Sequence, residues 1–172
     1  MRRRRIVAFA VASAFMAVPP PASATGFGPG GGGYYYADNG GHSFWYSPYL
    51  PTSDKAITDW AWVNSLDAQT DMSTSMNSTW NSQVDVVVDA DYDSSVNAIA
   101  ITYCVYFVSS DKCDQFDIVY NEYYHAQYHG RHVACHEIGH TTGLGEGTVD
   151  GCMAATGDYF GSHDRSHING RY

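Results

Sequence analysis

Four stretches of the chain have the apolar, aromatic and β-branched residues typical of β-strands, at residues 43–49, 84–89, 98–108 and 116–120. The period of two is clearest at 84–89, where Val84, Val86 and Val88 occupy alternate positions, as expected when successive side chains point to opposite faces of a sheet. After the first stretch the pattern changes to helical spacing, with Thr52 or Ser53 as the expected N-cap. The buried stripe expected for this helix consists of Ala56, Ile57, Trp60, Ala61 and Val63. Residues 69–82 are rich in Ser, Thr and Asn and predict a loop.

The N-terminal residues have the three parts of a secretory signal peptide. Four arginines at positions 2–5 precede an apolar run at 6–18, and Ala22-Ser23-Ala24 follows as a small-residue cleavage site. The apolar run is too short to span a bilayer. We therefore expect residues 1–24 to be removed during general secretion to the extracellular space. Residues 25–41 are rich in glycine and tyrosine and predict a flexible leader, which leaves residues 42–172 as one domain.

Composition and charge exclude some classes of partner. The full chain has 9 basic and 18 acidic residues, and removal of the four N-terminal arginines leaves 5 against 18, a formal net charge of −13. A protein this acidic repels nucleic acid and anionic membranes, so we expect neither as a partner. About 150 mature residues suffice for one domain with its own core, and we expect a monomer.

A second helix is expected to contain the motif His136-Glu137-Ile138-Gly139-His140. Histidines four residues apart project from one helical face and can bind one zinc ion, while Glu137 can reach a water molecule bound to that ion. Gly143 tolerates left-handed backbone geometry, so the chain can turn back and bring Glu146 to the metal as a third ligand. The alternative interpretation is that the motif binds no metal and belongs to a surface helix that happens to have two histidines and a carboxylate.

This motif, followed by Gly143, a third ligand and a methionine, resembles the metzincin metallopeptidases. In that family the third ligand is usually His or Asp, whereas this chain has Glu146. Met153 corresponds to the methionine of the family's Met-turn. Asp164, Ile168 and Tyr172 follow one another at intervals of four residues, and this helical spacing resembles the closing helix of matrixin-type domains. The resemblance implies an α+β fold, with a twisted mixed β-sheet, an active-site helix and a small C-terminal subdomain.

The same resemblance implies a secreted zinc endopeptidase that acts on a peptide or protein substrate. Zinc would be held by His136, His140 and Glu146, and Glu137 would act as the general base. An extended substrate would pair antiparallel with an edge strand, for which we expect residues 116–121. Two alternatives remain open, namely a zinc hydrolase of non-peptide amides and an inactive zinc-containing binding protein.

The four cysteines of an exported chain predict two disulfides, for which three pairings exist. Cys104 and Cys113 flank an expected hairpin turn, which favours their pairing. Pairing of Cys135 with Cys152 would then connect the metal-binding helix to Met153. A thiolate zinc ligand is the competing interpretation of Cys135, but on a helix this residue points about 100° away from His136.

Further acidic residues and histidines are weaker candidates for metal sites. Asp89, Asp91 and Asp93 have the spacing that opens a calcium loop, but Ser94 and Ala100 replace its glycine and glutamate. We expect an acidic turn there, with calcium as the weaker alternative. Asp150 is the main alternative to Glu146 as the third zinc ligand, and His163 is a weaker alternative. Surface roles are expected for five further histidines, namely His125, His129, His132, His163 and His167. His132 is one helical turn from His136, so a position near the metal or the substrate cleft is its alternative.

Overall fold

The computed structural model describes residues 26–29, 33–124, 128–147, 150–154 and 157–172. The predicted signal peptide and His125 lie outside the described residues. Within the described part of the chain, no helix has both the length and the apolar character needed to cross a membrane.

Six strands of the described residues form one mixed β-sheet. They are β1 (Tyr36–Ala37), β2 (Gly41–Tyr46), β3 (Ser73–Met76), β4 (Val86–Asp91), β5 (Ala100–Phe107) and β6 (Lys112–Asn121). The order runs β3–β2–β4–β6–β5, and β1 pairs with the start of β6. Only the β5–β6 pairing is antiparallel among these strands. The predicted mixed sheet is therefore confirmed, with a strand in each of the four stretches predicted to form one.

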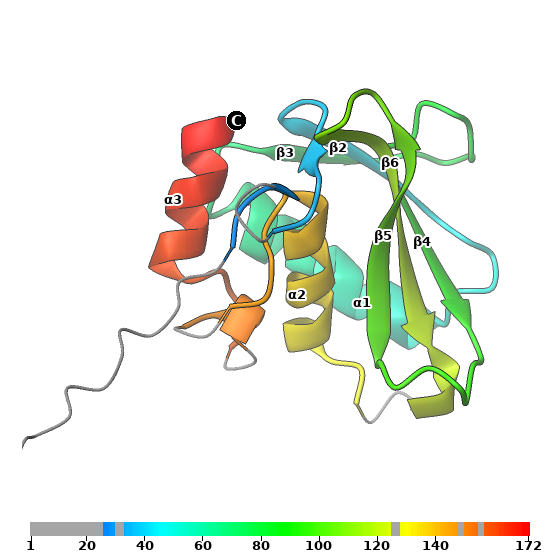
Figure 1. Ribbon diagram of the computed structural model, residues 1–172. Coiled ribbons are helices and arrows are strands. Elements are labelled where there is room, and N and C mark those ends of the chain that lie inside the picture. The colour runs from blue at the N-terminus through cyan, green and yellow to red at the C-terminus, as the bar shows by residue number, and fades with distance from the viewer. Residues whose placement is uncertain (1–25, 30–32, 125–127, 148–149, 155–156) are drawn as a thin grey trace, which may run out of the picture.

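Two of the helices pack beside this sheet, and a third lies farther from it. The chain forms α1 (Thr52–Ala61), which continues as the π-helix η2 (Trp62–Asp67), then α2 (Arg131–Thr141) and α3 (Ser162–Arg171). Two short 3-10 helices, η3 (Glu122–Tyr124) and η4 (Cys152–Ala154), lie in the connections. Figure 1 shows α1 and α2 beside the sheet and α3 on the far side of α2. The fold is thus a mixed α/β arrangement in which α2 is central.

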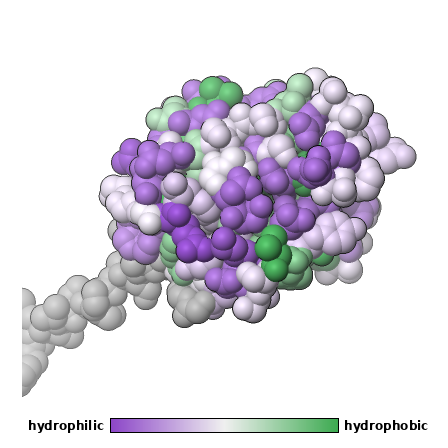
Figure 2. Space-filling model, turned by 90° about the horizontal axis from the view of Figure 1, so that it is seen from above, coloured by the Kyte–Doolittle hydropathy of each residue, from purple (hydrophilic) through white to green (hydrophobic). Residues whose placement is uncertain are grey.

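The core lies between the sheet and the helices. Alternate residues of β6 point into it, so that Phe116, Ile118 and Tyr120 are buried while Asp117 and Val119 face the opposite side. The ring of Phe44 on β2 stacks on Trp62 of η2 with centroids 5.0 Å apart. The outer surface is mostly hydrophilic in the view from above, with apolar colour limited to small patches (Figure 2).

The helix after Pro51 forms as predicted, but its expected buried stripe is only partly right, with Ala61 buried and Ile57 and Trp60 partly buried against the core. Ala56 and Val63 are exposed, and the buried residues are Asp54, Thr58 and Ala61, followed by Trp62. Polar partners explain this orientation, because Asp54 lies 3.1 Å from His129 and Thr58 shares a hydrogen bond with Tyr120 of β6. The wider turn of the π-helix then changes the phase of the buried face.

Other local predictions also require correction. The helix has Pro51 at its N-cap position and no side-chain cap, so neither Thr52 nor Ser53 has the expected role. The expected loop at 69–82 contains strand β3, which pairs in parallel with β2. Described residues of the Gly/Tyr-rich segment also pack on the domain, since β1 joins the sheet and Ala37 is only 2% exposed.

Candidate metal centre

The end of α2 brings the chain back towards the two histidines. Gly143 has φ +100°, a left-handed conformation that glycine adopts without steric cost. The amide of Leu144 donates to Gly139 O and that of Gly143 to His140 O, which is the Schellman arrangement of a helix terminus. The reversal predicted at Gly143 is therefore present, and it carries Glu146 to the face of α2 that bears His136 and His140.

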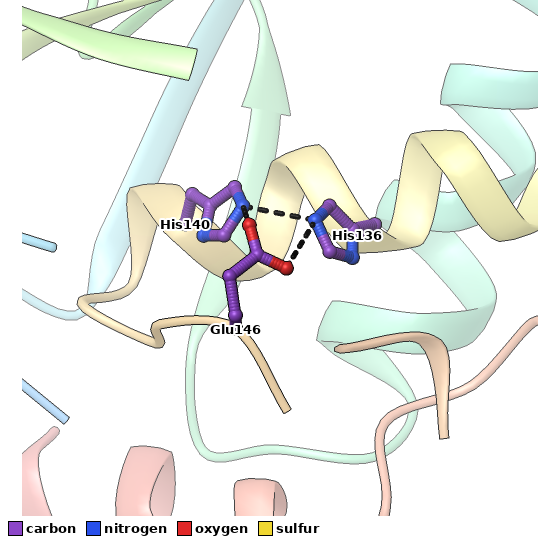
Figure 3. A group of neighbouring side chains, drawn as sticks. All are labelled: His136, His140 and Glu146. Atoms are coloured by element: carbon purple, nitrogen blue, oxygen red, sulfur yellow. Dashed lines mark hydrogen bonds and ion pairs between the residues drawn. The ribbon is translucent and has the colours of Figure 1, made fainter. Parts of the chain in front are cut away.

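Three potential ligand atoms converge at this place (Figure 3). The Nε2 atoms of His136 and His140 are 3.0 Å apart, and the carboxylate oxygens of Glu146 lie 3.5 Å from the first and 3.6 Å from the second. Tetrahedral zinc with bonds of about 2.0–2.1 Å has ligand atoms about 3.3 Å apart. The observed distances thus fit one ion held by two imidazoles and a carboxylate.

Backbone carbonyl groups orient both imidazole rings. Nδ1 of His136 hydrogen bonds to Cys152 O at 3.0 Å, and Nδ1 of His140 hydrogen bonds to Leu144 O at 2.9 Å. Because a carbonyl only accepts, each Nδ1 carries the proton and each Nε2 presents a lone pair to the centre. Such outer contacts are typical of metal-binding histidines. The pKa of Glu146 is lowered, first by its contact with the His140 imidazole and then by that with His136, against an opposing effect of burial.

Glu137 lies next to this centre and is held by a residue that the sequence did not indicate. Its side chain is buried, and Oε2 accepts a hydrogen bond of 2.6 Å from Thr102 Oγ1 on β5. The antiparallel β5–β6 hairpin makes β5 the edge strand on this side of the sheet. The expected edge strand at 116–121 is therefore wrong, because β6 lies between β4 and β5.

The segment after the ligands forms the floor beneath α2. Met153 is buried in η4, and a side chain at Gly139 would collide with its sulfur atom. A disulfide joins Cys135 of α2 to Cys152, and a second joins Cys104 to Cys113 across the β5–β6 hairpin. Both disulfides favoured by the sequence are confirmed, and Cys135 is not a free thiolate ligand.

A cavity opens beside the histidines at the N-terminal half of α2. Its volume is about 320 Å³, and it is lined by residues from α2 and from the start of β5, including Ala100, His132, Val133, His136 and Glu137. His132 hydrogen bonds through Nδ1 to Gly157 O at 2.6 Å. His132 therefore lies at the cleft, as the spacing on the helix allowed.

Tyr34 covers the opposite end of the centre. Its ring stacks on that of His140 with centroids 3.9 Å apart and planes inclined by 21°. Burial, and then the negative charges of Glu137 and Glu146, raise the pKa of Tyr34 above its ordinary value. The sequence indicated no role in the metal centre for this residue, because only a tyrosine cluster in a glycine-rich segment marks it.

The weaker candidates do not join the centre. Asp150 is exposed and is absent from both groups of metal-ligand atoms found within 4.8 Å of one another among the described residues. The second group consists of Asp54, Glu122 and His129 at the end of the sheet, so His129 is buried rather than solvated. His163 and His167 lie together on α3, 4.4 Å apart between ring centroids.

The acidic turn predicted at 89–93 lies on the outer face of the sheet. Asp89, Asp91, Asp93 and Asp117 line a cavity of about 380 Å³ there. None of them belongs to the two groups of converging ligand atoms in the described part of the chain. Calcium at this position stays a prediction without geometric support.

Comparison of the chain with models of known protein families and with curated protein sequences finds no match.

Proposed function

We propose that the protein is a secreted zinc-dependent endopeptidase of the metzincin type. The observation that carries this proposal is the convergence of His136, His140 and Glu146 on one point, with Glu137 lining the same cavity as His136. A structural zinc site usually has four protein ligands, whereas a catalytic site keeps one position for water or substrate. Three converging ligands with an adjacent carboxylate fit the second case.

In the proposed mechanism, Glu137 and Thr102 have different roles. When bound, zinc supplies a Lewis acid that polarises a carbonyl group and lowers the pKa of water towards about 7. Glu137 takes the proton of the attacking water and delivers it to the leaving nitrogen, a role worth about 10²–10⁴-fold in rate. Thr102 donates to one oxygen of Glu137 and so leaves the other oxygen for the proton.

The edge strand supports a peptide as the substrate. β5 pairs only with β6 among the described strands, and its residue Thr102 touches Glu137. An extended peptide that added to the free edge of β5 would lie along the metal centre, with main-chain hydrogen bonds providing affinity. The cavity lined by His132 and Val133 would accept a side chain next to the scissile bond.

The metzincin type is supported by the order of elements and by the floor of the site. Met153 is buried under α2 after the third ligand, and α3 follows it. Glu146 in place of the usual His or Asp is the departure from that family. The two disulfides and the signal-like N-terminus support secretion.

The decisive experiment compares Glu137→Gln with the wild type as residues 25–172. Glu137 would contact the attacking water and not the ion, so the variant should retain about one zinc per chain and lose nearly all peptidase activity. Zinc content and cleavage of an unstructured protein are measured on the same samples.

Three results would contradict the proposal. Equal cleavage by the variant and the wild type would remove Glu137 from the mechanism. A wild type that binds zinc but cleaves only non-peptide amides would identify another hydrolase. A wild type that binds zinc and cleaves neither substrate would leave a binding protein.

A further inference from the structure

The N-terminal strap, which we define as residues 26–29 and 33–37, passes beside the C-terminal end of α2 (Figure 1). Its first part is fixed to the turn after α2. The amide of Gly28 donates to Gly143 O and the amide of Gly145 donates to Gly26 O, both at 2.8 Å. Phe27 thereby forms an antiparallel bridge with Leu144, two residues before Glu146.

The second part of the strap is fixed to the sheet and to the C-terminal residue. Tyr36 N donates to Asp111 O at 3.0 Å, and β1 pairs with the start of β6. The hydroxyl of Tyr172 accepts from Ala37 N and donates to Thr142 O at the end of α2. With attachments on both sides of Tyr34, the strap is built into the fold, unlike a lid that opens at a single hinge.

Close packing supports the same conclusion. Gly28 has φ +69° and lies against the ring of Tyr36, so that any side chain at this position would collide with it. The ring of Phe27 also stacks on His167 of α3 with centroids 4.8 Å apart. The strap therefore connects α2, α3 and the sheet, and these contacts determine the position of Tyr34.

From this geometry we infer that Tyr34 is a positioning residue of the metal centre, acting through His140. This inference rests on the proposed zinc site. His140 is held at Nδ1 by Leu144 O, which fixes one edge of its ring but permits rotation about that hydrogen bond. The stacked ring of Tyr34 covers one face of the imidazole, fixes its plane and excludes water from it. His136 has no such ring contact with the strap among the described residues, and its side chain is 18% exposed against 3% for His140.

The test is the zinc affinity of residues 25–172, measured for the wild type and for three separate variants, Tyr34→Ala, Tyr34→Phe and Tyr35→Ala. Loss of the ring should weaken zinc binding by about 10- to 100-fold, the range typical of outer-shell residues. Phenylalanine keeps the stack and should bind zinc as the wild type does. Tyr35 is the matched control, because it is the next residue of the strap but packs edge-on against Phe107 instead of a histidine.

Cobalt substitution provides a readout that general loosening of the fold does not reproduce. The visible absorption of bound Co²⁺ reports ligand geometry and should change in Tyr34→Ala, while Tyr34→Phe and Tyr35→Ala retain the wild-type spectrum. Thermal unfolding of the metal-free variants identifies any that do not fold, and Tyr34→Leu then replaces Tyr34→Ala as the variant without an aromatic ring.

Several outcomes would overturn the inference. Wild-type zinc affinity in the variant without the ring, or equal losses in Tyr34→Ala and Tyr35→Ala, would show that the stack does not position His140. A loss in Tyr34→Phe equal to that in Tyr34→Ala would assign the effect to the hydroxyl group. Faster peptide cleavage with unchanged zinc affinity would make Tyr34 an obstruction to substrate. If the wild type binds no zinc, the proposed function fails and this inference with it, whereas the other outcomes overturn this inference alone.

Discussion

Glu146 differs from the two histidines of the candidate metal centre in its exposure. Its side chain is 72% exposed, whereas those of His136 and His140 are 18% and 3% exposed. An exposed ion pair contributes only about 0–1 kcal/mol, so contact with the histidines alone would make Glu146 nearly dispensable. A metal bond, in contrast, would make it essential for metal affinity. Substitution of this one residue therefore distinguishes the two interpretations.

We predict that Glu146→Ala lowers zinc affinity sharply, because two histidines alone leave half of a tetrahedral site without a protein ligand. Asp150→Ala is the matched control, since this carboxylate is also exposed but lies outside the group of converging ligand atoms. Metal titration of both variants under the same conditions is the measurement. Loss of zinc by Asp150→Ala, with retention by Glu146→Ala, would reverse the assignment.

Single residues were predictable from the sequence only where helical geometry relates them. His136, Glu137 and His140 lie within one and a half turns, so spacing alone groups them. Thr102 and Tyr34 reach the same centre from strands and segments distant in the chain. Their contacts depend on the register of β5 and on the path of the strap, which local periodicity does not contain.

At the scale of elements, α2 is connected by hydrogen bonds and a disulfide to the two segments that follow it. The Schellman turn brings back Glu146, and the disulfide between Cys135 and Cys152 fixes the floor. The carbonyl of Cys152 is also the hydrogen-bond acceptor for His136 Nδ1. This disulfide consequently supports both the stability of the fold and the orientation of a proposed metal ligand.

We predict that replacing Cys135 and Cys152 by alanine lowers the free energy of unfolding by about 3 kcal/mol, because the bridge closes a loop in the unfolded chain. Zinc affinity should fall as well, since Cys152 O is no longer held beneath His136. Replacement of Cys104 and Cys113 is the control, with a smaller closed loop and an expected cost of about 2.5 kcal/mol. Denaturant unfolding and zinc titration of both pairs test this. Equal zinc affinity in the two double variants would contradict the orienting role.

The elements themselves were largely predictable, and their partners were not. Local sequence patterns located β2, β4, β5 and β6, but the sequence could not say that β6 is an internal strand and β5 is the edge. Hydropathy also described the buried face of α1 only in part, because it missed Asp54 and Thr58, which are buried through tertiary hydrogen bonds. Such partners come from other elements, and a pattern within one element does not reveal them.

At the scale of the whole molecule, His42 lies where the sheet, η2 and α2 meet. It is on β2, its Nε2 hydrogen bonds to Thr141 Oγ1 at 3.0 Å, and its ring makes an edge contact with Trp62. Burial lowers the pKa of His42 to about 4 and outweighs backbone hydrogen bonds and the charge of Asp38, which act in the opposite direction. The residue is therefore neutral in the folded protein at neutral pH, and unfolding exposes it to protons.

This burial predicts a loss of stability in mild acid. In the unfolded chain the pKa of His42 is about 6.5, so between about pH 6.5 and about pH 4 only the unfolded state binds a proton at this residue. The free energy of unfolding should be fully retained above this window and should fall within it, by up to about 3 kcal/mol at its lower end. His42→Gln cannot gain that proton, while its amide can still donate to Thr141. Denaturant unfolding of both proteins from pH 7.5 to 4 should show a steeper decline for the wild type. Parallel curves would mean that His42 is not held neutral, because the other titrating groups are common to both proteins.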